Sequence, residues 1–173
     1  VESQLRTSDV SDPRVIAAMA HVPREDHVPP ARRASAYIDR SVSLGNGRAI
    51  NPPLATGRLL NAAAIEPGDK VLLIGAAGGY CAAVISAMGA RVVAVEQDDL
   101  LDGKRKELPG VTWIDGPLAK GAASHGPFDV LIIDGAVEQV PATLSDQLAD
   151  GGRVVTGIVE HGVTRLSSGR KVG

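Results

Sequence analysis

The chain of 173 residues has few of the residue types that mark several common protein classes. Cys81 is its one cysteine, which excludes an internal disulfide and fits a cytoplasmic protein. The four histidines lack the spacing of metal ligands, so no metal site is expected. No apolar run reaches the roughly 20 residues that span a bilayer, which argues against a membrane protein. Residues 1–10 also lack the apolar core of a signal peptide.

Two further shortages argue against a nucleic-acid partner. Lysine and arginine number 18 against 20 aspartate and glutamate residues, so the net charge is -2 and no basic surplus exists to neutralise phosphates. Aromatic residues make up 2% of the chain and are too dispersed to form a platform for stacked bases. These residues are Tyr37, Tyr80, Trp113 and Phe128. A core must therefore be aliphatic.

What the chain does contain is ample aliphatic sequence, with 44% hydrophobic residues and a length that suits one domain. Residues 1–52 read as a small helical and loop segment that covers the active site. Residues 53–173 alternate strands with helices. We expect the two parts to form one compact domain.

The pattern in residues 1–52 predicts short helices and a loop. Asp12 and Pro13 form a helix start, with Asp as the cap and Pro in the first turn, and apolar residues follow at helical spacing over 15–20. Residues 31–37 form a second short helix. Residues 43–53, "SLGNGRAINPP", are rich in Gly, Asn and Pro, which predicts a loop. The loop is either a plain connector or a cover laid over a ligand.

The remainder predicts an α/β fold with a doubly wound, mostly parallel sheet and helices on both faces. Continuous apolar runs such as "KVLLIG" are typical of strands that are covered on both faces. The expected strands cover 70–75, 91–96, 111–115, 128–134 and 153–159, with another over 163–171. The expected helices cover 53–64, 80–88, 98–108 and 141–148, and "DGG" at 150–152 is expected to be a turn.

The segment "VLLIGAAGGYCAAVISAMG" predicts a strand that turns on glycines into a helix. Such turns bind nucleotide-like ligands, but Ala77 stands where a dinucleotide fingerprint needs its second glycine. This makes a nicotinamide dehydrogenase remote. A ligand without a pyrophosphate still fits, because Gly75 allows the bend and Gly78 or Gly79 lets the helix start lie close to it.

Acidic residues end three strands of the expected sheet: Glu96, Asp115 and Asp134. Ligands of such sheets bind outside the carboxyl ends of the strands, where these side chains meet. Glu96 lies 21 positions after Gly75, as expected of a carboxylate that accepts hydrogen bonds from ribose hydroxyls. S-adenosylmethionine fits this edge, since its cationic groups suit acidic surroundings and its carboxylate suits a helix amino terminus.

Taken as a whole, the sequence resembles the protein-L-isoaspartate O-methyltransferases, and the resemblance extends over nearly the whole chain. It is carried by "VESQLR", "DPRVIAAMAHVPREDHVP", "AYIDR", "LGNGRAINPP", the glycine segment above, "VAVEQ" and "FDVLIIDGAVEQVPATLSDQLADGGRVV". The glycine turn is common to many methyltransferases, whereas the amino-terminal segments are specific to this family. The resemblance implies a Rossmann-like fold and methyl transfer from S-adenosylmethionine to isoaspartyl carboxylates of damaged proteins. The ester then collapses to a succinimide, and hydrolysis of the succinimide returns some normal aspartyl linkages.

The resemblance also implies roles for single residues. Asn51 is implied as the catalytic residue, because it replaces the family's usual active-site Ser and still offers a hydrogen-bond donor to a carboxylate. The cofactor-binding residues are the turn with Gly75, Ala76, Ala77, Gly78 and Gly79, the ribose ligand Glu96 with Gln97, Asp115 and Gly116 near the adenine, and Asp134. Family members continue beyond residue 173 into a final hairpin and have a longer helix after Glu96.

Two alternatives stay open. The first is a non-catalytic module that only binds the cofactor. It is motivated by three departures from the family pattern: Asn51, Leu73 in place of a usual acidic residue, and Ala77-Gly78 in place of a usual Gly-Ser. A methyltransferase with a different acceptor is the other.

Methylating a carboxylate needs no strong base, because the acceptor is already ionised near neutral pH. The absence of a Ser-His-Asp arrangement is therefore no argument against the enzyme.

Overall fold

The computed structural model describes residues 10–45, 48–97 and 108–172. Its main sheet has six strands: β3 (Lys70–Ile74), β4 (Arg91–Glu96), β5 (Val111–Asp115), β6 (Phe128–Val137), β7 (Leu148–Glu160) and β8 (Val163–Arg170). The helices are α2 (Pro13–His21), α3 (Pro53–Ala63), α4 (Tyr80–Ala87) and α5 (Ala142–Ser145). Short 3-10 helices are η1 (Arg24–His27), η2 (Pro30–Ser35), η4 (Leu118–Lys120) and η5 (Ala123–His125).

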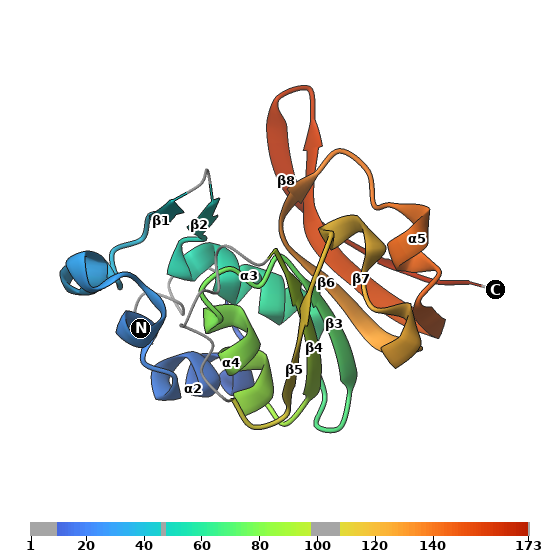
Figure 1. Ribbon diagram of the computed structural model, residues 1–173, viewed down its shortest axis with the longest axis horizontal. Coiled ribbons are helices and arrows are strands. Elements are labelled where there is room, and N and C mark those ends of the chain that lie inside the picture. Colours follow the sequence, from blue (N-terminus) through green and yellow to red (C-terminus); the bar gives the residue numbers. More distant parts are fainter. Residues whose placement is uncertain (1–9, 46–47, 98–107, 173) are drawn as a thin grey trace.

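The strands lie in the order β5-β4-β3-β6-β7-β8 (Figure 1). Neighbouring strands pair in parallel from β5 to β7, and β8 is antiparallel to β7. The chain runs outward from β3 through β4 to β5 and then returns to place β6 on the other side of β3. This reversal is the switch point at which doubly wound sheets bind ligands. The structure therefore confirms the expected Rossmann-like arrangement.

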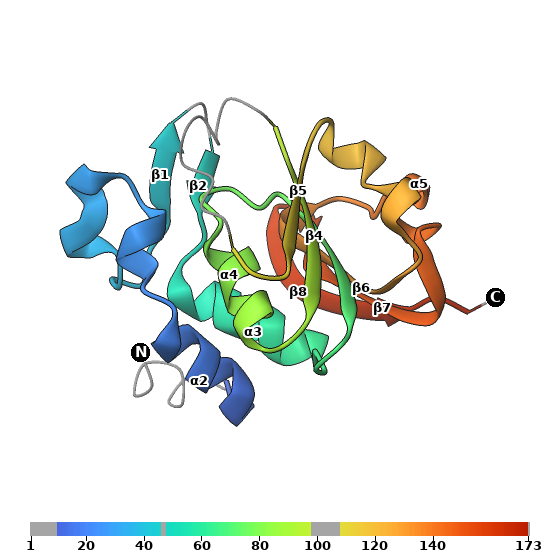
Figure 2. The same cartoon turned by 60° about the horizontal axis from the view of Figure 1, so that its bottom comes forward.

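Aliphatic side chains fill the space on both faces of the sheet. Leu72 and Leu73 are adjacent on β3 and both fully buried, but they belong to different core clusters because successive strand side chains point to opposite faces. One cluster packs against α2, α3 and α4, and the other includes Leu144 of α5. Figures 1 and 2 show these helices on opposite sides of the sheet. Burial on both faces explains why the strand sequences are continuously apolar.

The amino-terminal segment begins as the sequence predicts. Asp12 caps α2 by accepting a hydrogen bond from the backbone N–H of Arg14, and Pro13 occupies the first turn. Met19 faces the core, and among the alanines of α2 it is Ala18 that is buried, whereas Ala20 is exposed. The short helix expected over 31–37 is the 3-10 helix η2.

Several expected boundaries were wrong. The predicted loop 43–53 contains part of a hairpin, in which β1 (Val42–Gly45) pairs with β2 (Arg48–Ile50). The helix expected over 141–148 is reduced to the four residues of α5, and "DGG" lies within β7, where the register against β6 shifts. The strand over 128–134 continues to Val137. Most of the helix expected over 98–108 lies outside the described residues. Among the described residues, no helix has the length and apolarity needed to span a membrane.

Candidate functional site

The glycine turn after β3 has the backbone shape that the sequence indicates. Gly75 and Gly79 have φ angles of +81° and +86°, a region that favours glycine because it has no Cβ. Ala77 adopts φ +45°, so an alanine holds a left-handed conformation in the middle of the turn. A Cβ at Gly78 would collide with the backbone carbonyl of His27. The amino-terminal segment thus packs directly on the turn.

Glu96 is the charged centre of the site. Its side chain is fully buried at the end of β4. Oε2 accepts hydrogen bonds from the backbone N–H of Ala77 at 2.7 Å and from Nη2 of Arg48 at 2.8 Å. Oε1 accepts one from the backbone N–H of Gln97 at 2.9 Å. The carboxylate therefore ties the glycine turn to the end of β4, and Arg48 supplies the opposite charge that a buried carboxylate needs.

Asn51 and Asp134 form the second polar pair. Nδ2 of Asn51 donates a hydrogen bond of 2.7 Å to Oδ1 of Asp134. Burial raises the pKa of Asp134 to about 6, against the opposing effects of the Asn51 hydrogen bond and of Arg24 and Arg48, while Glu96 adds to the increase. Asn51, from the end of the β1–β2 hairpin, is thereby fixed to β6.

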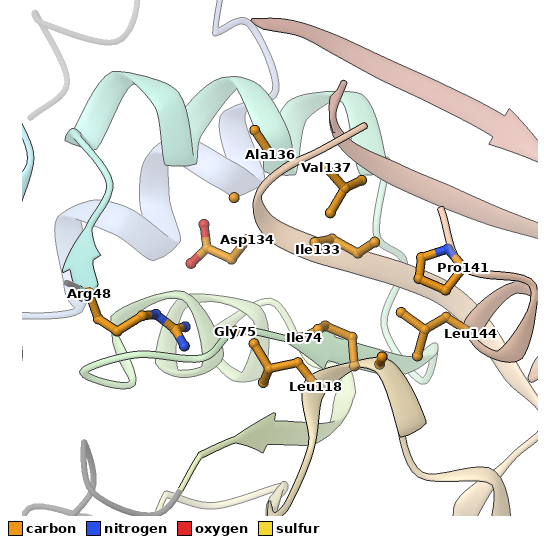
Figure 3. A pocket seen from close by; sticks show the side chains of 12 residues that line it. Arg48, Ile74, Gly75, Leu118, Ile133, Asp134, Ala136, Val137, Pro141 and Leu144 are labelled. Carbon is orange, nitrogen blue, oxygen red and sulfur yellow. The ribbon is translucent and has the colours of Figure 1, made fainter. Parts of the chain in front are cut away.

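A cavity of about 320 Å³ opens beside these residues, a size within the range of small-molecule sites. Its wall comes from the ends of β3 and β6 and from η4 and α5, and includes Gly75, Asp134, Leu118 and Leu144. Figure 3 shows Arg48 and Asp134 at one end and aliphatic side chains at the other. A ligand with a polar and an apolar part fits this arrangement.

Arg24 supports the site through its buried side chain. Its side chain is fully buried, donates from Nε to the carbonyl of Ala36, and donates from Nη2 to the carbonyl of Asn51 at 2.6 Å. The guanidinium lies 4.9 Å from the ring centre of Tyr80, the first residue of α4. Nη1 has no hydrogen-bond partner among the described residues, so the aromatic face is what compensates part of its burial. Arg24 therefore fixes the backbone that presents Asn51.

The structure brings together part of the predicted set. Gly75 and Asp134 line the cavity, Asn51 binds Asp134, and Glu96 lies under the turn. The buried Ala76, Ala77 and Gly79 shape the turn and do not line the cavity. Gln97 and Asp115 are exposed, and Gly116 donates a backbone hydrogen bond of 3.2 Å to the carbonyl of Glu96. Asp115 does pair in register with Glu96 at the same sheet edge.

Sequence reasoning missed the two arginines and the apolar wall. Arg48 lies within the segment predicted as a loop, and Arg24 lies within the family segment "VPREDHVP", but neither position has a spacing that indicates its partner. The apolar wall comes from Leu118, Pro141 and Leu144. These residues look like ordinary core in the sequence.

Comparison with known proteins identifies the family. The family model for protein-L-isoaspartate(D-aspartate) O-methyltransferase matches residues 1–172. The chain belongs to this family. Among curated members, the protein-L-isoaspartate O-methyltransferase of Gloeobacter violaceus is 40% identical over 162 residues, covering 90% of this chain and 78% of that protein. The Koribacter versatilis enzyme of the same name is 37% identical over 161 residues, with 90% and 72% covered.

Solved structures of methyltransferases have the same fold. A structure named protein-L-isoaspartate O-methyltransferase superposes with a TM-score of 0.82 at 24% identity, covering 99% of this family member and 59% of that chain. This family member therefore spans less than two thirds of that structure. A Plasmodium falciparum protein described as a beta-aspartate methyltransferase, solved with S-adenosyl-L-homocysteine, gives 0.78 at 21% identity, with 98% and 88% covered.

Proposed function

We propose that the protein transfers the methyl group of S-adenosylmethionine to the carboxylate of L-isoaspartyl residues in damaged proteins or peptides. The observation that carries the proposal is the match of the family model to residues 1–172. The cavity at the switch point of the sheet supports it, because Gly75 and Asp134 line it where such sheets bind ligands. The buried carboxylate of Glu96 lies beside it.

The residues present fit the cofactor. Glu96 would accept hydrogen bonds from the ribose, and the apolar wall with Leu118 and Leu144 would take the flat base or the aliphatic chain. Asp134 places negative charge at the end of the cavity, which suits a sulfonium or an ammonium group. When bound, the cofactor supplies an electrophilic methyl group.

The chain's own part in the reaction is alignment. The acceptor carboxylate is already ionised, so the site needs no general base and must hold oxygen, carbon and sulfur in line. The Asn51 amide carries two N–H groups, of which one binds Asp134. The second can bind an oxygen of the acceptor. Arg24 fixes the Asn51 backbone during this step.

The test is a methylation assay on an isoaspartyl peptide, run beside the same peptide with a normal aspartyl linkage. We expect a base-labile methyl ester on the isoaspartyl peptide alone. Asn51→Ala should lower kcat/KM by about 10- to 100-fold, the value of one hydrogen bond to a charged group. Asn51→Ser keeps a donor and should retain more activity than Asn51→Ala.

Asn61→Ala is the matched control. Asn61 accepts hydrogen bonds from the backbone N–H groups of Ser11 and Asp12, away from the cavity, so its loss should cost stability and leave kcat/KM unchanged. No methylation above the aspartyl peptide would refute the proposed acceptor. If calorimetry showed S-adenosylhomocysteine binding in that case, the chain would be a cofactor-binding module or an enzyme with another acceptor.

A further inference from the structure

The carboxylate expected to bind ribose is already engaged by Arg48. Oε2 of Glu96 accepts two hydrogen bonds, from the backbone of Ala77 at 2.7 Å and from Arg48 at 2.8 Å. A carboxylate oxygen has two lone pairs, so this oxygen is saturated. Two ribose hydroxyls can take both oxygens of Glu96 only if one of these donors leaves.

Arg48 is the donor that can leave. The N–H groups of Ala77 and Gln97 belong to the turn and to the end of β4, so moving either one would disrupt the backbone. The Arg48 side chain is 27% exposed and extends from the three-residue strand β2 on four rotatable bonds. Displacing the guanidinium is therefore the route for ribose binding that leaves the backbone in place.

Arg48 lies near the Asp134 backbone even while it binds Glu96. Its Nη2 and the backbone carbonyl of Asp134 each lie 3.5 Å from the point that a Cβ on Gly75 would occupy. Asp134 in turn is bound by Asn51. Figure 3 shows the guanidinium at the same end of the cavity as the Asp134 carboxylate.

The charges at this end require a mobile cation. Asp134 repels a second carboxylate when it is ionised, and the acceptor brings one. Among the described residues that line the cavity, Arg48 is the one with a positive charge. Arg24 is nearby but is held by the carbonyls of Ala36 and Asn51. Of the described residues that line this cavity, Arg48 is the one that combines a positive charge with freedom to move.

We infer that Arg48 is the specificity-determining residue for the acceptor carboxylate, held on Glu96 until the ribose displaces it. The inference rests on the proposed function and makes binding ordered, with the cofactor first. In the transfer, the acceptor oxygen forms a bond to the methyl carbon, the carbon–sulfur bond breaks, and its electron pair goes to sulfur. The product ester is neutral, so it loses the attraction of Arg48 and leaves more easily.

The test measures binding without turnover, by calorimetry with S-adenosylhomocysteine and an isoaspartyl peptide. In the wild-type protein, saturating S-adenosylhomocysteine should tighten peptide binding by about 5-fold or more, a typical coupling between two sites. By reciprocity, the peptide should tighten S-adenosylhomocysteine binding by the same factor. Arg48→Met should bind S-adenosylhomocysteine more tightly, because no ion pair has to be broken, and should lose the coupling.

Arg91→Met is the matched control, because Arg91 is an exposed arginine at the opposite end of β4 and should behave as wild type. If Arg48→Met keeps the coupling, the acceptor role of Arg48 is wrong. If it binds S-adenosylhomocysteine no more tightly than wild type, the displacement by ribose is wrong. Coupled binding in the wild type together with no methylation would refute the proposed function alone.

Discussion

Asp134 is a residue of the site whose pKa is raised by its surroundings. Its folded-state pKa of about 6 lies above the ordinary value of 3.8, mainly because burial disfavours the charged form. The folded protein therefore binds the Asp134 proton more strongly than the unfolded chain does. The stabilising contribution is complete below about pH 4 and is lost as the pH rises through about 6.

We predict that wild type gains about 1 kcal/mol of unfolding free energy relative to Asp134→Asn between pH 7.5 and pH 5. Asparagine does not titrate, and it can still pair with Asn51, so the variant removes the charge with little change in shape. Urea unfolding at the two pH values measures the difference. Asp150→Asn, which changes an exposed carboxylate, should follow wild type. Parallel responses of wild type and Asp134→Asn would contradict the raised pKa.

Single residues were predictable where a local rule applies to them. Gly75 could be predicted from the glycine turn, Glu96 from its spacing of 21 positions after Gly75, and Asp12 from its place before Pro13. Arg48 and Arg24 were not predictable in the same way. Arg48 binds a partner 48 positions away and Arg24 one 27 positions away, and only the folded chain brings them together. Charge pairs at the site depend on tertiary contacts that no local spacing encodes.

At the scale of elements, the strands were the easiest to predict, since burial on both faces produces continuous apolar runs. The hairpin of β1 and β2 was missed because Gly and Asn indicate a turn without showing that the short flanking segments pair. The predicted helix over 141–148 was too long, because α5 ends at Ser145 and the turn that follows contains Gln147. The Gln147 side chain forms hydrogen bonds with Ala122 and Lys120 instead of facing solvent, and β7 begins at Leu148.

Gln147 holds the apolar wall of the cavity together. Its Oε1 accepts from the backbone N–H of Ala122 at 2.9 Å, and its Nε2 donates to the carbonyls of Lys120 and Thr143 at 2.8 and 2.9 Å. These bonds join α5 to the segment that contains η4 and η5. Both sides contribute to the cavity, through Leu144 and Leu118.

We expect Gln147→Ala to lower the unfolding free energy by about 2–3 kcal/mol, because buried backbone groups lose their partners. Hydrogen exchange at the Ala122 amide should accelerate more than exchange at strand amides of β3. Gln139→Ala changes an exposed glutamine and should leave both quantities unchanged. An unchanged Ala122 amide in Gln147→Ala would show that other contacts hold this wall.

At the scale of the whole molecule, the division of the chain between residues 52 and 53 stays a prediction that is based on the change in sequence pattern. The contacts favour a single cooperative unit. Met19 of α2 is fully buried in the same cluster as Leu60 of α3 and Tyr80 of α4. The sequence alone could not decide this, because an apolar stripe on α2 shows that the helix packs but does not show against what.

The last prediction compares a core residue of the amino-terminal segment with one on the far face of the sheet. Met19→Ala and Leu72→Ala each remove a fully buried side chain, and each should lower the unfolding free energy by about 2–5 kcal/mol. We expect the molecule to unfold as one unit, so both should shift a single urea transition, with Trp113 fluorescence and circular dichroism coincident. Ile38→Ala changes a side chain that is 51% exposed and should have an effect within about 0.5 kcal/mol. A second transition in Met19→Ala alone would mean that the segment carrying Asn51, Arg48 and Arg24 unfolds independently. The site would then be assembled only part of the time, because Arg48 binds Glu96 and Asn51 binds Asp134 in the sheet, and Arg24 holds the backbone of Asn51.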